Sequence, residues 1–176
     1  TGAKNPDGPA DPIMVFPDVR RLLISSRAFV EGARALAMYT SFLFSVARSS
    51  KDEAERQEAE DLSQLFTPVI KAYFTDKGFE AANASMQVFG GHGYIEEQGM
   101  SQFVRDARIA MIYEGANGIQ ALDLVARKMT SKGGRATLAY FAKLEAFIKE
   151  NEGDAEMKIY IDALRTGYGR LGEAAG

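Results

Sequence analysis

The sequence contains no cysteine and no tryptophan, and its single histidine is His92. Without cysteine, neither a disulfide framework nor a thiolate metal site can form. One histidine is also too few for a histidine-rich metal site. We therefore predict a protein without disulfide bonds and without a metal centre.

Charge of one sign and long apolar runs are missing as well. The formal net charge is −3, and acidic and basic residues are mixed along the chain. Binding to a phosphate backbone depends on clustered Lys and Arg, so we expect no nucleic-acid partner. No apolar run approaches the roughly 20 residues of a membrane span, so we expect no membrane association either.

The opening segment lacks an initiator methionine, and it lacks the basic start and apolar stretch of a signal peptide. It is polar and rich in Pro and Gly, which is typical of a connector. We interpret residues 1–16 as a connector within a longer chain. With no targeting signal in this segment, we expect a cytoplasmic protein of bacterial type.

A long amphipathic helix is predicted from about Pro17 to Arg48. Apolar residues recur there at steps of three, four or seven, which is the pattern of a helix with one buried face. Pro17 and Asp18 both favour a helix start at this point. The stripe consists of Val19, Leu22, Phe29, Ala33, Leu36, Leu43 and Ala47.

Further helices are predicted along the rest of the chain. A second long helical pattern contains Pro68, where the helix either starts afresh or is kinked, and it ends before Gly90. Shorter helices follow, one at about 99–107 and one after Glu114, the latter with Ile119, Leu122, Val125 and Ala126 facing inward. Gly133 and Gly134 end this pattern, and two more helices are predicted at about 135–149 and 155–171.

The fold class that results is all-α, an up-and-down four-helix-type bundle with two additional C-terminal helices. Residues 17–132 form the bundle in this interpretation, and residues 133–176 form a C-terminal helical extension. The charged run from Asp52 to Asp61 is expected to be a solvated helix face.

The first candidate site is the stretch QVFGGHGY, which spans Gln87 to Tyr94. Three glycines in four residues allow the backbone N–H groups to approach a ligand such as a phosphate closely. Glycine clusters between helices are more often simple turns, however. The spacing alone leaves both interpretations open.

The second candidate site is IYEGANGIQALDL, in which Glu114 follows an apolar run and precedes a glycine and a helix. A carboxylate among apolar neighbours holds a proton more strongly, because burial disfavours its charged form. Such a group suits proton abstraction next to a carbonyl. The alternative is an ordinary glutamate that is stabilised by the helix dipole.

Taken together, these stretches closely resemble the C-terminal signature of acyl-CoA dehydrogenases. The resemblance includes the glutamine with a glycine pair, the Arg-Asp-Ala at Arg105 to Ala107, and a Tyr-Glu-Gly followed by Ile-Gln. It covers about Pro12 to Lys128. From Gly133 onward, the chain resembles the helical tail of a larger subgroup that includes 3-methylmercaptopropionyl-CoA dehydrogenases.

The resemblance implies a role for each matching residue. Glu114 matches the base that removes the α-proton of the acyl thioester, while its backbone N–H faces the thioester carbonyl. The residues beside it, Tyr113 and Gly115, match substrate-binding positions. The positions that match contacts to FAD are Gln87, Gly90, Gly91 and Asn117. The Arg105–Asp106 pair is expected to form a buried or half-buried ion-pair network that fixes the segment before Glu114.

The resemblance also implies the reaction and its partners. An acyl-CoA substrate is oxidised to trans-2-enoyl-CoA, with FAD as the hydride acceptor, electron-transfer flavoprotein as the electron acceptor and a homo-oligomer as the assembly. A chain of this extent is expected to be inactive alone. Two alternatives stay open, an acyl-CoA oxidase-like relative and a helical interaction or assembly module without catalysis.

Overall fold

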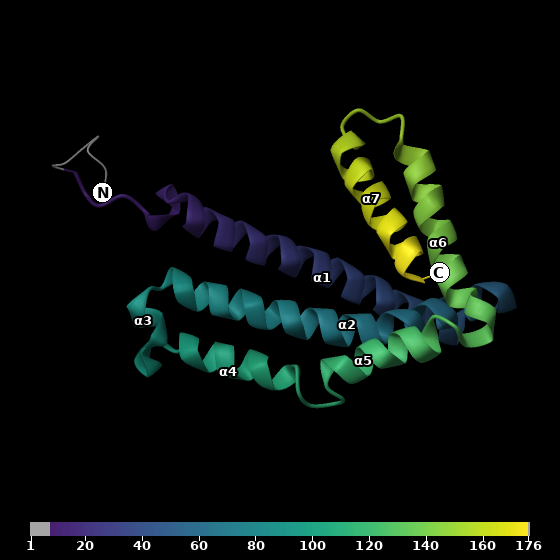
Figure 1. Ribbon diagram of the computed structural model, residues 1–176, viewed down its shortest axis with the longest axis horizontal. Coiled ribbons are helices and arrows are strands. Elements are labelled where there is room, and N and C mark those ends of the chain that lie inside the picture. Colours follow the sequence, from purple (N-terminus) through teal and green to yellow (C-terminus); the bar gives the residue numbers. More distant parts are fainter. Residues whose placement is uncertain (1–7, 176) are drawn as a thin grey trace. The chain divides into compact units, whose positions relative to one another are not determined.

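The computed structural model describes residues 8–175, and these residues form helices and turns without any β-strand. The all-α helical-bundle prediction is therefore confirmed. The predicted connector lies partly outside the described residues, and its described part includes a short 3₁₀ turn, η1 (Ile13–Val15). The main helices are α1 (Pro17–Ser49), α2 (Glu53–Val88), α3 (Gly91–Tyr94), α4 (Met100–Ala110), α5 (Asn117–Asp123), α6 (Ser131–Asn151) and α7 (Lys158–Ala175) (Figure 1).

Helix α2 continues through Pro68, which is among the most deeply buried side chains. Of the two predicted alternatives at this position, a fresh start is thus wrong. A short 3₁₀ turn, η2 (Glu96–Gln98), precedes α4, and a π-helical turn, η3 (Leu124–Lys128), extends α5. Lys132, Gly133 and Gly134 have φ values of 52°, 69° and 77°, so the regular part of α6 begins after them. This interruption confirms the predicted break at the glycine pair.

The described chain divides into two compact units. The first comprises the residues up to Ser41 together with Thr67–Leu122, and the second comprises Phe42–Phe66 with Asp123–Gly176. The predicted division at residue 133 stays a prediction about the domains of the protein. The residues assigned to substrate, base and cofactor in both candidate sites lie within the first unit.

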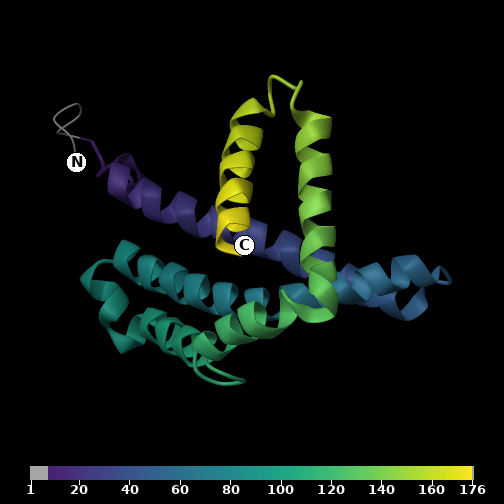
Figure 2. The ribbon, with the colours of Figure 1, turned by 45° about the vertical axis from the view of Figure 1, so that its right-hand side comes forward.

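In the first unit, the N-terminal part of α1 runs antiparallel to the C-terminal part of α2, and α4 returns along α2 (Figures 1 and 2). The predicted apolar stripe of α1 faces the interior of the protein, since each of its residues is buried or half-buried. Within this unit, Phe29 contacts Tyr73 and Phe74 edge to face, with ring centroids 6.1 and 6.3 Å apart. The predicted amphipathic register of α1 is therefore confirmed.

The second unit contains a hairpin formed by the end of α1 and the start of α2, and a second hairpin formed by α6 and α7 (Figure 2). Leu62 is fully buried, and Phe66 packs edge to face on Tyr140 at 5.3 Å. Asp61 is also buried here, where it pairs with Lys132 and Arg135. The expectation of a wholly solvated face from Asp52 to Asp61 is wrong at Asp61, because the cations come from a helix far away in sequence.

Two further expectations are wrong. Ile119, Leu122 and Val125 are about three-fifths exposed and Ala126 is exposed as well, whereas the half-buried Asn117 is the residue of α5 that hydrogen-bonds to α2. Arg105 and Asp106 are exposed, and Asp106 accepts a hydrogen bond from Gln102 at 2.7 Å on the same helix. Neither residue is part of a buried network.

Candidate functional site

The turn between α4 and α5 carries Glu114 in an uncommon backbone conformation. Glu114 has φ 56° and Gly115 has φ 82°, so two consecutive residues are in the left-handed region. For a residue with a Cβ atom this conformation costs roughly 1–2 kcal/mol. Such strain persists only where the surroundings fix it, and it is found preferentially at functional sites.

The local sequence explains why the chain turns here. Helix α4 ends after Ala110, where Met111 and Ile112 donate their N–H groups to the carbonyls of Arg108 and Ile109. Helix α5 then begins at Asn117. Gly115 has φ 82°, a conformation that residues with a Cβ atom rarely adopt, and an added Cβ would lie 3.0 Å from Nε2 of Gln120. The backbone therefore favours glycine directly after the glutamate.

The polar groups of Glu114 are available to a ligand. The residue is exposed, and no described residue forms an ion pair or hydrogen bond with its carboxylate. None of the described residues accepts a hydrogen bond from its backbone N–H either. Its carbonyl is engaged, because Nε2 of Gln120 donates to it at 3.2 Å. The turn thus offers one carboxylate and one N–H group from the same residue.

The neighbours of Glu114 differ in their surroundings. Tyr113 is 54% exposed and makes no recorded ring contact within the described chain. Asn117 is half-buried, and its side chain is fully occupied by α2. Sequence patterns gave no signal for the α2 residues that hold Asn117, because they lie more than 40 positions earlier in the chain.

The glycine turn after α2 lies at the other end of the first unit. Gly90 has φ 61°, and both Gly90 and Gly91 have open space where a Cβ would lie. Gly93 is different, because a Cβ there would lie 2.3 Å from the carbonyl oxygen of Met86. Gly93 therefore has a structural role in packing α3 on the end of α2, and the open backbone at Gly90 and Gly91 is available for close approach.

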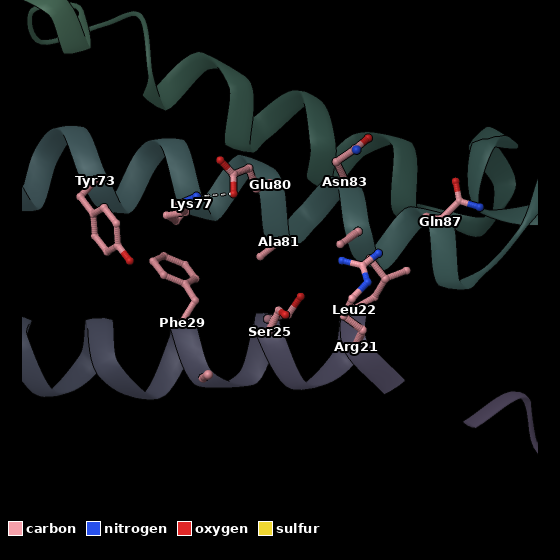
Figure 3. A pocket seen from close by; sticks show the side chains of 13 residues that line it. Arg21, Leu22, Ser25, Phe29, Tyr73, Lys77, Glu80, Ala81, Asn83 and Gln87 are labelled. Carbon is pink, nitrogen blue, oxygen red and sulfur yellow. Dashed lines mark hydrogen bonds and ion pairs between the residues drawn. The ribbon is translucent and has the colours of Figure 1, made fainter. Parts of the chain in front are cut away.

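A groove of about 800 Å³ lies between α1 and α2 in the first unit (Figure 3). Phe29 and Tyr73 line one end, while Arg21 and Gln87 lie toward the other. Within the groove, Nζ of Lys77 lies 2.7 Å from Oε2 of Glu80, which is three residues later on α2. The hydrogen bond to this carboxylate raises the pKa of Lys77. Gln87 is exposed, so the groove and the glycine turn share an accessible polar end.

A second, smaller pocket of about 120 Å³ lies in the second unit beside Asp61. Burial by itself would raise the pKa of Asp61, but the hydrogen bonds from Arg135 at 2.5 Å and Lys132 at 3.2 Å outweigh it and hold the pKa below its ordinary value. The carboxylate is thus neutralised by its partners, which is typical of an ion pair that anchors helices.

Among residues 8–175, no group of acidic or histidine side chains has the arrangement of a metal site. In the same part of the chain, no helix is both long and apolar enough to cross a membrane.

The comparisons with known proteins agree with the signature around Glu114. Residues 3–130 match the family model described as acyl-CoA dehydrogenase, C-terminal domain. The chain belongs to the acyl-CoA dehydrogenase family. It is 45% identical over 137 residues to 3-methylmercaptopropionyl-CoA dehydrogenase of Ruegeria pomeroyi, a match that covers 78% of this chain and 23% of that protein.

Other members of the acyl-CoA dehydrogenase family match at lower identity. A butyryl-CoA dehydrogenase of Syntrophomonas wolfei is 33% identical over 86% of this chain and 25% of its own length. A broad-specificity linear acyl-CoA dehydrogenase of Mycobacterium tuberculosis is 31% identical over 81% of this chain and 23% of its own length. The chain therefore spans about a quarter of the length of the relatives it matches.

Proposed function

We propose that this chain is the helical C-terminal part of an enzyme that oxidises acyl-CoA to trans-2-enoyl-CoA, with Glu114 as the base. The observation that carries the proposal is the unpaired carboxylate of Glu114 in a strained turn, which lies within the segment that matches the family model and resembles the family's Tyr-Glu-Gly. The relatives' names share acyl-CoA dehydrogenation and differ in the acyl group. The proposal therefore names the reaction and no particular acyl chain.

In the proposed reaction, the Glu114 carboxylate accepts the proton from the α-carbon of the thioester. The negative charge that develops on the thioester oxygen is stabilised by a hydrogen bond from the Glu114 backbone N–H, which has no acceptor among the described residues. Gly115 leaves the approach to this N–H unobstructed, and Tyr113 packs beside the thioester. One residue then supplies both the base and an oxyanion donor.

The cofactor of the proposed enzyme is FAD, which accepts the hydride from the β-carbon when it is bound. Three of the four assigned positions fit a dinucleotide approaching from outside the chain, since Gln87 is exposed and Gly90 and Gly91 are open. Asn117 fits less well, because its amide is already hydrogen-bonded to α2. A cofactor that approaches from outside the chain can be held by a neighbouring subunit, which suits a homo-oligomer. Electron-transfer flavoprotein is the proposed electron acceptor.

The deciding experiment is Glu114→Gln in the complete product of the gene that encodes this chain. We expect turnover to fall by about 10²–10⁴-fold, which is the usual contribution of a general base, while flavin content is unchanged. Glu97→Gln is the matched control, because Glu97 is also exposed and without a recorded partner in the described chain. Turnover that survives Glu114→Gln would favour the assembly-module alternative, and rapid oxygen consumption by the wild type would favour an oxidase.

A further inference from the structure

A cluster of polar side chains on α2 holds the first residue of α5. Oδ1 of Asn117 accepts a hydrogen bond from Nζ of Lys71 at 2.8 Å. Nδ2 of Asn117 donates to Oδ1 of Asp76 at 2.6 Å and to Oγ1 of Thr75 at 3.0 Å. The amide therefore has a cation on its oxygen side and a carboxylate on its nitrogen side, so its orientation is specified by charge.

The same cluster reaches the other end of the Glu114 turn. Nζ of Lys71 lies 3.5 Å from the carbonyl oxygen of Met111, which directly follows α4. The Lys71 ammonium group thus lies between Met111, where the turn begins, and Asn117, where α5 begins. Gln120 provides a third contact to the turn, because its side-chain amide donates a hydrogen bond to the Glu114 carbonyl.

These contacts fix a turn that the backbone would not adopt unaided. Glu114 is left-handed although it carries a Cβ atom, and no described residue holds its carboxylate or its N–H. The conformation must therefore be imposed from the two ends and from the carbonyl side. Lys71 and Asn117 supply the ends, and Gln120 supplies the carbonyl contact.

We propose that Lys71, Asn117 and Asp76 form a clamp that sets the direction of the Glu114 carboxylate and N–H, an inference that rests on the proposed function. The clamp residues are positioning residues, because they act through the turn and do not meet the reacting atoms. A base displaced by about 1 Å can lose on the order of 10²-fold in rate. The clamp therefore affects the proton-transfer step more than substrate binding.

The test inverts the polarity of the clamp in the complete gene product. Asn117→Asp places a second carboxylate 2.6 Å from Asp76, which repels it and displaces the start of α5. We expect kcat to fall by about 10- to 100-fold, KM to change little, and the isotope effect with α-deuterated acyl-CoA to rise. Adding Asp76→Asn restores a donor and an acceptor with their roles exchanged, and we expect it to recover most of the lost kcat.

A second variant tests the cation alone. Lys71→Met keeps an unbranched side chain one atom shorter but removes the donor to Asn117, and it is expected to lower kcat and raise the isotope effect in the same way. Lys71→Arg should retain most of the activity. Lys149→Met is the matched control, since Lys149 is an exposed residue of α6 outside the proposed site, and it should leave kcat unchanged.

The outcomes separate this inference from the proposed function. If Glu114→Gln is inactive but Asn117→Asp and Lys71→Met keep the wild-type kcat and isotope effect, the clamp inference is overturned. It is also overturned if Asp76→Asn fails to rescue Asn117→Asp in a folded, flavin-containing protein. If Asn117→Asp does not fold, the Lys71→Met result decides. Full turnover in Glu114→Gln refutes the proposed function itself.

Discussion

At the scale of single residues, Glu114 and Gly115 form a strained turn that is stabilised by contacts from neighbouring residues. Glu114 and Gly115 are two consecutive left-handed residues, and the carboxylate and N–H of Glu114 have no partner among the described residues. Gly115 adopts the left-handed conformation at little cost in free energy, because glycine has no Cβ atom. Glu114 cannot be replaced by glycine, because it carries the carboxylate. Its backbone strain is therefore offset by the hydrogen bonds of Asn117 and Gln120.

Gly115→Ala tests whether this turn sets the rate. Gly115 has φ 82°, and an added methyl group would meet the Gln120 amide at 3.0 Å. We expect kcat of the complete gene product to fall by about 10- to 100-fold, because the contact on the Glu114 carbonyl is displaced.

Gly118→Ala is the matched control for this change. Gly118 lies within α5 and has no atom within 4 Å of an added Cβ. Alanine should therefore be tolerated or stabilise the helix by about 0.5–1 kcal/mol. Equal turnover in the two variants, measured by steady-state kinetics, would show that the turn does not limit the reaction.

At the scale of helices, Asp61 links α2 to the start of α6 in the second unit. The side chain of Asp61 is 9% exposed, whereas those of Lys132 and Arg135 are about half exposed. Lys132 holds a left-handed conformation beside two glycines, and its ammonium lies on Asp61. The ion pairs therefore stabilise the abrupt turn that leads into α6.

Asp61→Asn should weaken this link at neutral pH. The partners lower the pKa of Asp61 in the folded state, so its contribution is present above the ordinary value of 3.8 and is lost as the pH falls through the lower, folded value. We expect a loss of about 1–3 kcal/mol at pH 7, read as faster hydrogen exchange in the first turns of α6. The difference from the wild type should shrink below about pH 4.

Asp162→Asn provides the comparison for this variant. Asp162 also has a lowered pKa, caused by the hydrogen bond and charge of Lys158, but the pair lies on an exposed face of α7. Exposed pairs contribute little to stability. A change in α7 as large as that in α6 would contradict the view that burial makes the Asp61 pair important.

Sequence patterns predicted the helices well where one face is apolar. The α1 stripe is correct because a 3.6-residue period reports which face is buried. The same rule failed for α5, where Ile119 and Leu122 are exposed and the polar residues Asn117 and Gln120 are half-buried. Asp61 escaped detection for a related reason, since its partners Lys132 and Arg135 are about 70 positions away. Periodicity contains no information about such distant polar partners.

At the scale of the whole molecule, burial is divided unequally between the two units. Every apolar residue in the most buried class of the described chain lies in the second unit, apart from Pro68 and Gly93. The first unit carries the assigned residues of both candidate sites, and it exposes large apolar side chains on α4 and α5, including Phe103, Ile109, Ile119 and Leu122. We expect these exposed apolar side chains to contact other parts of the complete protein.

The complete gene product should therefore differ from the isolated 176-residue chain. We expect the complete protein to be a yellow oligomer that retains flavin, since the relatives are about four times longer than the matched region. The isolated chain should be colourless and without turnover, because Glu114 is exposed and so are the proposed cofactor positions Gln87, Gly90 and Gly91. Absorbance near the flavin bands, together with light scattering, measures both properties. A colourless complete protein would count against the dehydrogenase proposal, whereas a flavin-binding, active isolated chain would show that these helices suffice for the site.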